Sequence, residues 1–167
     1  DTVLLVGDPG RVERISSFFD SIEFTISNRE FCTHTGMYNG NRVTALSTGI
    51  GTDNLDIVVN ELDAAVNINP ETKETNPKLR SLNLIRLGTC GALQSDLAID
   101  SVAITAHSIG LDGVRHFYNI EPSTTERQLE IAFQDHMEFN DTINKGYASS
   151  ADPQLLSKFD TLGTSGI

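Results

Sequence analysis

The spacing of apolar positions divides the first part of the chain into alternating strands and helices. Residues 2–6 form a short apolar run that ends at a glycine, which is typical of a buried strand. Residues 31–38 and 42–48 alternate around an Asn-Gly-Asn turn, so we expect them to pair as an antiparallel hairpin. Apolar positions at helical spacing over 9–19 and 52–66 predict two helices.

Short polar residues mark the starts of these helices, and a polar stretch follows the second one. Asp8 is placed to cap the first helix, and Pro9 suits its first turn. Thr52 or Asp53 is the expected cap of the second helix. Residues 67–81 are polar and contain two prolines, which predicts an exposed, inserted loop.

The pattern continues less regularly in the rest of the chain. A strand followed by a glycine turn is expected over 82–93, and a further strand over 101–111. Residues 121–146 are polar and mixed, whereas Asp152 is the expected cap of a helix that includes Phe159. Strands that end in glycine turns and alternate with helices predict an α/β fold, in which a mixed central β-sheet is flanked by helices in three layers.

Composition narrows the classes of partner. A net charge of −11 argues against a nucleic-acid or anionic-membrane surface, because both need a basic footprint. No apolar run approaches the roughly 20 residues of a membrane span. Cys32 and Cys90 lie far apart and form no paired motif, which favours a reducing compartment. We therefore expect a cytoplasmic protein that binds neither nucleic acid nor a membrane.

The two ends of the chain bear on its domain organisation. A length of 167 residues suits one ordinary domain. The chain begins directly on a strand at Asp1, without a methionine, and it ends at Thr-Leu-Gly-Thr-Ser-Gly-Ile with no clear boundary. We therefore expect residues 1–167 to be a single domain that is incomplete at its C-terminal end, as part of a longer one.

Glycine turns at the ends of two expected strands carry candidate anion-binding groups. After the first strand, Gly7 opens a turn, and Arg11 adds a cation at the start of a helix, where free N–H groups attract anions. This spacing fits neither a Walker loop nor a dinucleotide fingerprint, and an ordinary capped turn is the alternative. Arg86 stands within an apolar strand just before Thr89; the alternative there is an arginine that reaches solvent.

Two further segments complete the candidate set. Arg29 and Glu30 open a strand, where a surface ion pair is the alternative interpretation. Residues 47–54 contain another glycine turn with hydroxyl groups, and the four histidines show no metal-ligand spacing. Three arginines and a threonine that converge at strand ends form a good oxyanion site.

These segments resemble, in order, the motifs of a known enzyme family. The sequences GDPGR, REF, STGIG, RLGTCGAL and LDG followed by HF are similar to those of the nucleoside phosphorylases with the trimeric and hexameric fold. The resemblance covers about residues 3–117, and the nearest likeness is to the uridine phosphorylases of that family. It implies an enzyme in which inorganic phosphate, as co-substrate, cleaves a nucleoside to the free base and ribose 1-phosphate, without a cofactor.

The resemblance also implies roles for individual residues. Phosphate would be bound by Gly7, Arg11, Arg86 and Thr89, together with Arg29 from a neighbouring subunit. The active unit would then be at least a dimer, and a hexamer built from dimers is the expected assembly.

The resemblance assigns the nucleoside and a metal ion to nearby positions. Ile50 would lie near the ribose, while Cys90 and Gly91 would line the base pocket. Glu30, with Ile50, matches a site that holds a monovalent cation between subunits in some uridine phosphorylases.

Several features depart from the family pattern and keep alternatives open. The turn GTCG is similar to that of the purine enzymes, so a purine nucleoside phosphorylase is one alternative. The methionine flanked by two glutamates and the segment that recognises the base are missing, so the catalytic carboxylates are unknown. Two further alternatives are a hydrolytic nucleosidase of the same superfamily and a non-catalytic homologue that binds phosphate or nucleoside.

Overall fold

The computed structural model describes residues 1–137 and 145–160, which divide into two compact units. Unit 1 is Asp1–Gly91 and unit 2 is Ala92–Ile167. The elements of unit 1 are β1 (Thr2–Val6), α1 (Pro9–Ser16), β2 (Ser21–Asn28), β3 (Phe31–Tyr38), β4 (Asn41–Ser47), α2 (Thr52–Asn67) and β5 (Asn83–Arg86). Those of unit 2 are β6 (His107–Gly110), the 3-10 turn η1 (Val114–Phe117), α3 (Thr124–Met137), β7 (Tyr147–Ser150) and α4 (Pro153–Asp160).

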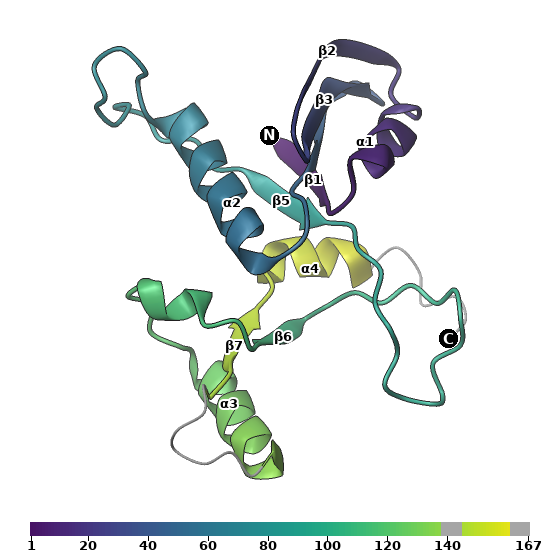
Figure 1. Ribbon diagram of the computed structural model, residues 1–167, viewed down its shortest axis with the longest axis vertical. Helices are drawn as coiled ribbons and strands as arrows, with labels where there is room; N and C mark the ends of the chain where they lie inside the picture. Colours follow the sequence, from purple (N-terminus) through teal and green to yellow (C-terminus); the bar gives the residue numbers. More distant parts are fainter. Residues whose placement is uncertain (138–144, 161–167) are drawn as a thin grey trace. The chain divides into compact units, whose positions relative to one another are not determined.

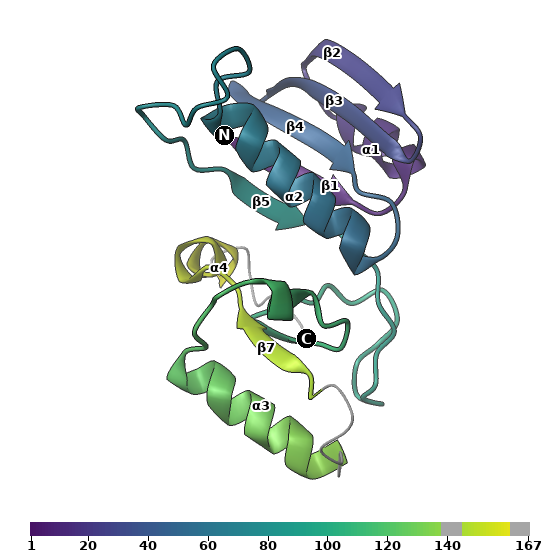
Figure 2. The same cartoon turned by 60° about the vertical axis from the view of Figure 1, so that its left-hand side comes forward.

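Unit 1 is built on a five-stranded sheet with the order β2-β3-β4-β1-β5 (Figures 1 and 2). β1 runs parallel to both β4 and β5, whereas β2, β3 and β4 form an antiparallel meander. The expected first strand, the hairpin and the mixed sheet are confirmed. The three parallel strands therefore end at the same edge of the sheet.

Helices cover both faces of this sheet, as expected for a three-layer α/β fold (Figure 2). On one face Val3 and Leu5 of β1 pack with Leu46 and with Val58 of α2. Side chains on the opposite face meet α1 and form a second cluster, which contains Val6, Val12, Cys32 and Ala45. The alternation along β1 supplies both clusters because successive side chains of a strand point to opposite faces.

The two helices of unit 1 begin in different ways. The Asp8 carboxylate accepts a hydrogen bond from the Gly10 N–H at 3.0 Å, which confirms the expected cap of α1. At α2 the capping residue is Gly51, with φ of 101° and no side-chain cap, so the assignment of Thr52 or Asp53 was wrong. The chain reaches α2 through glycines with positive φ, and Thr52 is already its first helical residue.

The polar segment after α2 is exposed, but the structure anchors it at its base. The buried Asn67 side chain accepts a hydrogen bond from the Arg80 N–H at 2.7 Å and donates to the Arg80 carbonyl at 3.1 Å. An isolated β-bridge pairs Ile68 with Thr75. These contacts close the segment and return the chain to the start of β5.

Unit 2 departs further from the sequence-based expectations. The strand expected over 101–111 is only the four-residue β6, which pairs antiparallel with β7. Residues 101–105 are exposed and form no strand, and no described strand pairs with them. No element was expected within 121–146, yet α3 lies there, and β7 begins directly after this stretch.

The helices of unit 2 both begin with side-chain caps. At α3 the Ser123 N–H donates to the Glu126 carboxylate at 2.7 Å, and the Glu126 N–H donates to the Ser123 hydroxyl at 3.3 Å, so the pair forms a capping box. This Ser-x-x-Glu pattern is visible in the sequence and is the signal that was overlooked. At α4 Asp152 accepts hydrogen bonds from two N–H groups at 2.9 Å each, as expected.

Candidate functional site

Loops that follow the parallel strands of unit 1 gather the candidate residues at one edge of the sheet. In the register of the sheet, Val6 of β1 lies beside Ser47 of β4, and Leu5 lies beside Arg86 of β5. The next residues along the chain are Gly7 and Thr48 in the first two loops. The strand order therefore brings together groups that are far apart in the sequence. In α/β sheets, ligands bind at this carboxyl edge.

One direct contact joins two of the proposed phosphate ligands. The Arg11 guanidinium donates a hydrogen bond from Nη2 to Oγ1 of Thr89 at 3.3 Å. Arg11 lies in the first turn of α1, where free N–H groups and the helix dipole attract anions. Gly7 adjoins the backbone of the β4 loop, since a Cβ atom there would lie 3.6 Å from the Gly49 carbonyl oxygen.

Arg86 lies at the same edge but not in the surroundings that its apolar neighbours indicated. It is the last residue of β5, an edge strand, and it is exposed rather than enclosed within the sheet. Its guanidinium Nη1 lies against the backbone of Gly88, where an added Cβ would meet it. A glycine at 88 therefore leaves room for the Arg86 side chain beside the loop that carries Thr89.

The turn between β2 and β3 places Arg29 at this edge as well. β3 is antiparallel to β4, so its start at Phe31 lies near the end of β4. Arg29 is exposed and adopts a positive φ of 55°, which is uncommon for a residue other than glycine. Among the described residues it forms no ion pair, so the surface pair with Glu30 is absent.

Glu30 is held by contacts on both its backbone and its side chain. The Ser47 hydroxyl donates to the Glu30 carbonyl at 2.6 Å and accepts from the Cys32 N–H at 2.7 Å. The Asn54 amide donates to the Glu30 carboxylate at 3.2 Å and to the Ile50 carbonyl at 3.3 Å. No signal in the sequence assigns a role to Asn54.

The residues that the resemblance assigns to the nucleoside lie open to solvent. The Ile50 side chain is 93% exposed, and Cys90 and Gly91 are exposed at the end of unit 1. None of the three therefore packs into the core of unit 1, and each remains accessible to a ligand.

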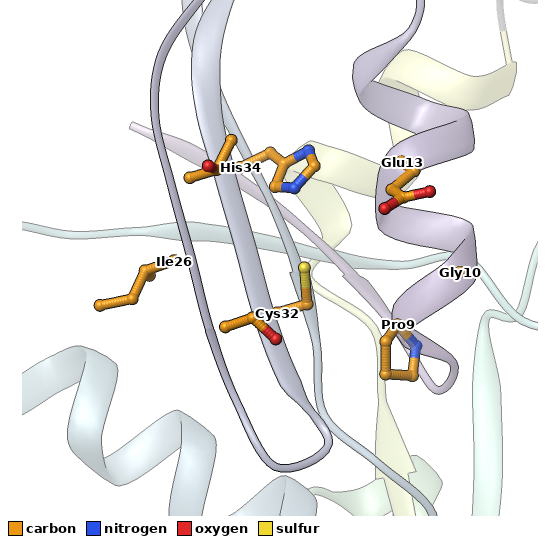
Figure 3. A pocket seen from close by; sticks show the side chains of 8 residues that line it. Pro9, Gly10, Glu13, Ile26, Cys32 and His34 are labelled. Carbon is orange, nitrogen blue, oxygen red and sulfur yellow. The ribbon is translucent and has the colours of Figure 1, made fainter.

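A hollow of about 300 Å³ lies between α1 and the β2–β3 hairpin. Figure 3 shows the His34 ring extending from β3 toward α1, and Glu13 and Pro9 line the opposite side. The His34 Nδ1 atom lies 2.7 Å from the Ser16 hydroxyl, so this histidine is hydrogen-bonded as the sequence analysis favoured. None of the proposed phosphate ligands lines this hollow.

Unit 2 contains its own hollow, of about 320 Å³, beside a partly buried arginine. The Arg115 Nη1 atom donates to the Ala148 carbonyl at 2.6 Å and lies 3.6 Å from the Glu130 carboxylate. Its guanidinium also lies 5.8 Å from the centre of the Tyr147 ring. These contacts tie η1 to β7 and α3, so Arg115 has a structural role within the unit.

The LDG motif also has a structural role in unit 2. Asp112 accepts hydrogen bonds from the Val114 N–H at 2.8 Å and from the Tyr147 hydroxyl at 2.9 Å. Desolvation raises the pKa of Asp112, but these hydrogen bonds together outweigh it, so the pKa is lowered. Desolvation and the neighbouring Asp112 raise the pKa of Tyr147.

The described residues contain neither a metal-binding cluster nor a membrane span. No group of three or more histidine, cysteine, aspartate and glutamate side chains among them is placed to hold a metal ion. Within the same ranges, no helix has both the length and the apolar character needed to cross a bilayer.

Comparison with known proteins shows the family of the chain. The family model described as "Phosphorylase superfamily" matches residues 1–160. The chain belongs to this superfamily. A solved structure of a nucleoside phosphorylase from Trypanosoma brucei, which shows uridine phosphorylase activity, superposes with a TM-score of 0.82 at 29% identity; the match covers 95% of this chain and 54% of that one.

Curated relatives of the superfamily include enzymes for both classes of base. The uridine phosphorylase of Haemophilus influenzae is 35% identical over 69% of this chain and 40% of its own length. A DeoD-type purine nucleoside phosphorylase of Bacillus velezensis is 30% identical over 95% of this chain and 53% of its own length. The chain thus spans about half, or less than half, of the length of these superfamily relatives.

Proposed function

We propose that the protein cleaves a nucleoside, with uridine the favoured substrate, by transfer of its ribosyl group to inorganic phosphate. The hydrogen bond between Arg11 and Thr89 is the observation that carries this proposal. It joins the first turn of α1 to the loop after β5 at the carboxyl edge, where Gly7 and Arg86 also lie. Two guanidinium groups, a hydroxyl and a helix N-terminus suit a phosphate dianion.

The proposed chemistry needs positioning more than covalent work by the protein. A phosphate oxygen forms a bond to the anomeric carbon while the bond from that carbon to the base nitrogen breaks. The base leaves with the bonding electron pair and takes up a proton, and ribose 1-phosphate is the other product. A phosphate held by arginines supplies the nucleophile and stabilises the positive charge that develops on the sugar.

The nucleoside is proposed to bind beside the phosphate, next to the exposed residues Ile50, Cys90 and Gly91. Arg29 is proposed to complete the phosphate site of a neighbouring subunit in a dimer, and dimers would assemble further into a hexamer. Its exposed position on the β2–β3 turn, without an ion pair among the described residues, supports this role.

A panel of nucleosides, assayed with and without phosphate, tests the proposal. Uridine, thymidine, inosine and adenosine are incubated with the protein, and the free base and ribose 1-phosphate are measured. We expect cleavage that requires phosphate and is fastest with uridine. Cleavage at the same rate without phosphate would show a hydrolytic nucleosidase instead, and binding without cleavage would show a non-catalytic homologue.

The purine alternative has its own support. The loop GTCG at 88–91 and the match to the DeoD-type enzyme both favour a purine nucleoside phosphorylase. Faster cleavage of inosine than of uridine in the same panel would establish this second candidate.

A further inference from the structure

The Asn54 side chain lies between two oxygen atoms that the family resemblance offers to a monovalent cation. Its Nδ2 atom is 3.2 Å from the Glu30 carboxylate and 3.3 Å from the Ile50 carbonyl. A carboxylate and a carbonyl only accept hydrogen bonds, so the NH₂ end of the amide must face them. One amide nitrogen carries two N–H donors and can therefore serve both oxygens.

The backbone beneath this contact is shaped to allow it. A Cβ atom at Gly49 would lie 2.7 Å from the Asn54 Nδ2 and 2.7 Å from the Glu30 Cγ. Gly49 also has a positive φ of 71° and is buried. The glycine thus leaves the space in which the side chains of Glu30 and Asn54 meet, which ties the β2–β3 turn to the first turn of α2.

With the amide in this orientation, the space between the two oxygens does not fit a bound cation. Hard cations are surrounded by several oxygen ligands. Here the N–H donors of Asn54 point into the space between the two oxygens, and a positively charged ion is repelled by the positive end of an N–H dipole. Glu30 is only partly buried, so water can solvate its remaining charge without a counter-ion.

We propose that the Asn54 amide takes the place of the cation, so that this protein needs no monovalent ion. Asn54 is then a positioning residue, which holds Glu30 and with it the turn that carries Arg29. The inference goes beyond the proposed reaction and does not depend on it, because its test measures thermal stability rather than turnover.

The midpoint of thermal unfolding tests the inference in three salts of equal ionic strength: potassium, sodium and choline chloride. For the unaltered protein we expect the same midpoint in all three, since choline is too large to enter a site of this kind. Asn54→Asp replaces the donor with a carboxylate beside Glu30. In choline chloride we expect this variant to have a lower midpoint than the unaltered protein. Potassium or sodium should then raise its midpoint, by about 2–4 °C.

Asn41→Asp is the matched control, because it adds the same charge away from a second carboxylate. In the described part of the chain the Asn41 amide bonds the Asn39 carbonyl at 3.1 Å and no carboxylate. We expect no difference among the salts for this variant. If Asn54→Asp does not fold in any salt, Asn54→Ser replaces it in the test, because it removes the same amide donor. We then expect potassium or sodium to raise the thermal midpoint of Asn54→Ser relative to choline.

Two results would overturn the inference. The first is a higher midpoint for the unaltered protein in potassium or sodium than in choline, which would show that a cation binds despite the amide. The second is a folded Asn54→Asp or Asn54→Ser variant whose midpoint is the same in all three salts. A failure of the nucleoside assay would leave both measurements interpretable.

Discussion

Arg11 and Thr89 are 78 positions apart in the sequence, and a side-chain hydrogen bond joins them at the edge of the sheet. Each residue alone has an ordinary explanation, as a solvated arginine and as a loop hydroxyl. Together they present a charged and a neutral donor to the same small volume, which is the requirement for selective binding of an oxyanion. The contact therefore makes Arg11 the residue to test first.

Substitution of Arg11 by alanine is expected to raise the KM for phosphate by about 10- to 100-fold, because a hydrogen bond to a charged group contributes about 1.5–3 kcal/mol. Arg14→Ala removes the same group from the last turn of α1 and should leave this KM unchanged. Initial rates at varied phosphate concentration measure both. An equal rise of the KM for phosphate in the two variants would assign the effect to net charge rather than to the site.

Gly49 and Gly40 allow the space beside a glycine to be separated from its backbone conformation. Their φ values are 71° and 74°, but an added Cβ meets Asn54 and Glu30 at position 49 and nothing within 4 Å at position 40. We expect Gly40→Ala to cost about 1 kcal/mol of unfolding free energy, from backbone strain alone. Gly49→Ala should cost about 1–3 kcal/mol more, from the steric clash. Urea unfolding measures the free energy of unfolding of the two variants. Equal losses of this free energy would contradict a steric effect at position 49.

At the scale of elements, the caps explain why some helices were predicted and another was overlooked. Asp8 and Asp152 precede a proline at the first helical position, and both helices were predicted. The capping box of Ser123 and Glu126 starts a mixed, polar helix without a buried residue, so apolar periodicity did not reveal α3. Its start depends on hydrogen bonds more than on packing.

The Glu126 carboxylate makes the start of α3 sensitive to acid. Hydrogen bonds from Ser123, and a further one from Ser150, lower the pKa of Glu126 from 4.5 to about 2. Because the folded-state pKa is the lower one, the stabilisation is complete above the ordinary pKa and is lost as pH falls from there toward 2. The contribution of Glu126 therefore declines across this acidic window.

Glu126→Gln is expected to weaken the dependence of stability on pH in that window, measured as the thermal midpoint of the helical circular dichroism signal at about pH 5 and about pH 3. Glu121→Gln is the matched control, since among the described residues the Glu121 carboxylate pairs with Arg127 in an exposed ion pair. It should follow the pH dependence of the unaltered protein. A Glu126→Gln variant with the same acid response as that control would contradict the assignment.

At the scale of the whole molecule, the parallel strands of unit 1 gather the candidate site, but one of its parts is proposed to come from another subunit. Arg86 ends β5, whereas Arg29 lies on the turn before β3 at the far side of the sheet order. If Arg29 serves a neighbouring subunit, the two arginines of one chain act in two different sites. This arrangement can be tested by mixing inactive variants.

Arg29→Ala and Arg86→Ala are each expected to lose most phosphorolytic activity as separate proteins, as the phosphate site loses a charge. When the two are unfolded and refolded together in equal amounts, one site of each mixed dimer regains both arginines. About a quarter of the unaltered activity should return, since half of the dimers are mixed and each has one complete site. If Arg29 serves its own chain, no activity returns on mixing.

The sequence predicted unit 1 more closely than unit 2, and the pattern of burial explains why. In unit 1 the apolar positions of β1 alternate between two cores, so their period reflects real packing. In unit 2 Ala148 is the buried apolar residue among those described, whereas Leu93 and Ile99 are 98% and 94% exposed. An apolar residue that packs on nothing gives no reliable period, and the strand expected over 101–111 was accordingly too long.

The sequence by itself determined the local structure and the chemical types of the site: the strand β1, the capped helices α1 and α4, the β3–β4 hairpin, and the glycine turns beside arginines. It determined these because caps, turns and alternation act between near neighbours in the chain. Only the tertiary structure decided which side chains meet. The contact of Arg11 with Thr89, the exposed end position of Arg86 and the link from Asn54 to Glu30 depend on strand order and register, which bring distant loops to one edge of the sheet.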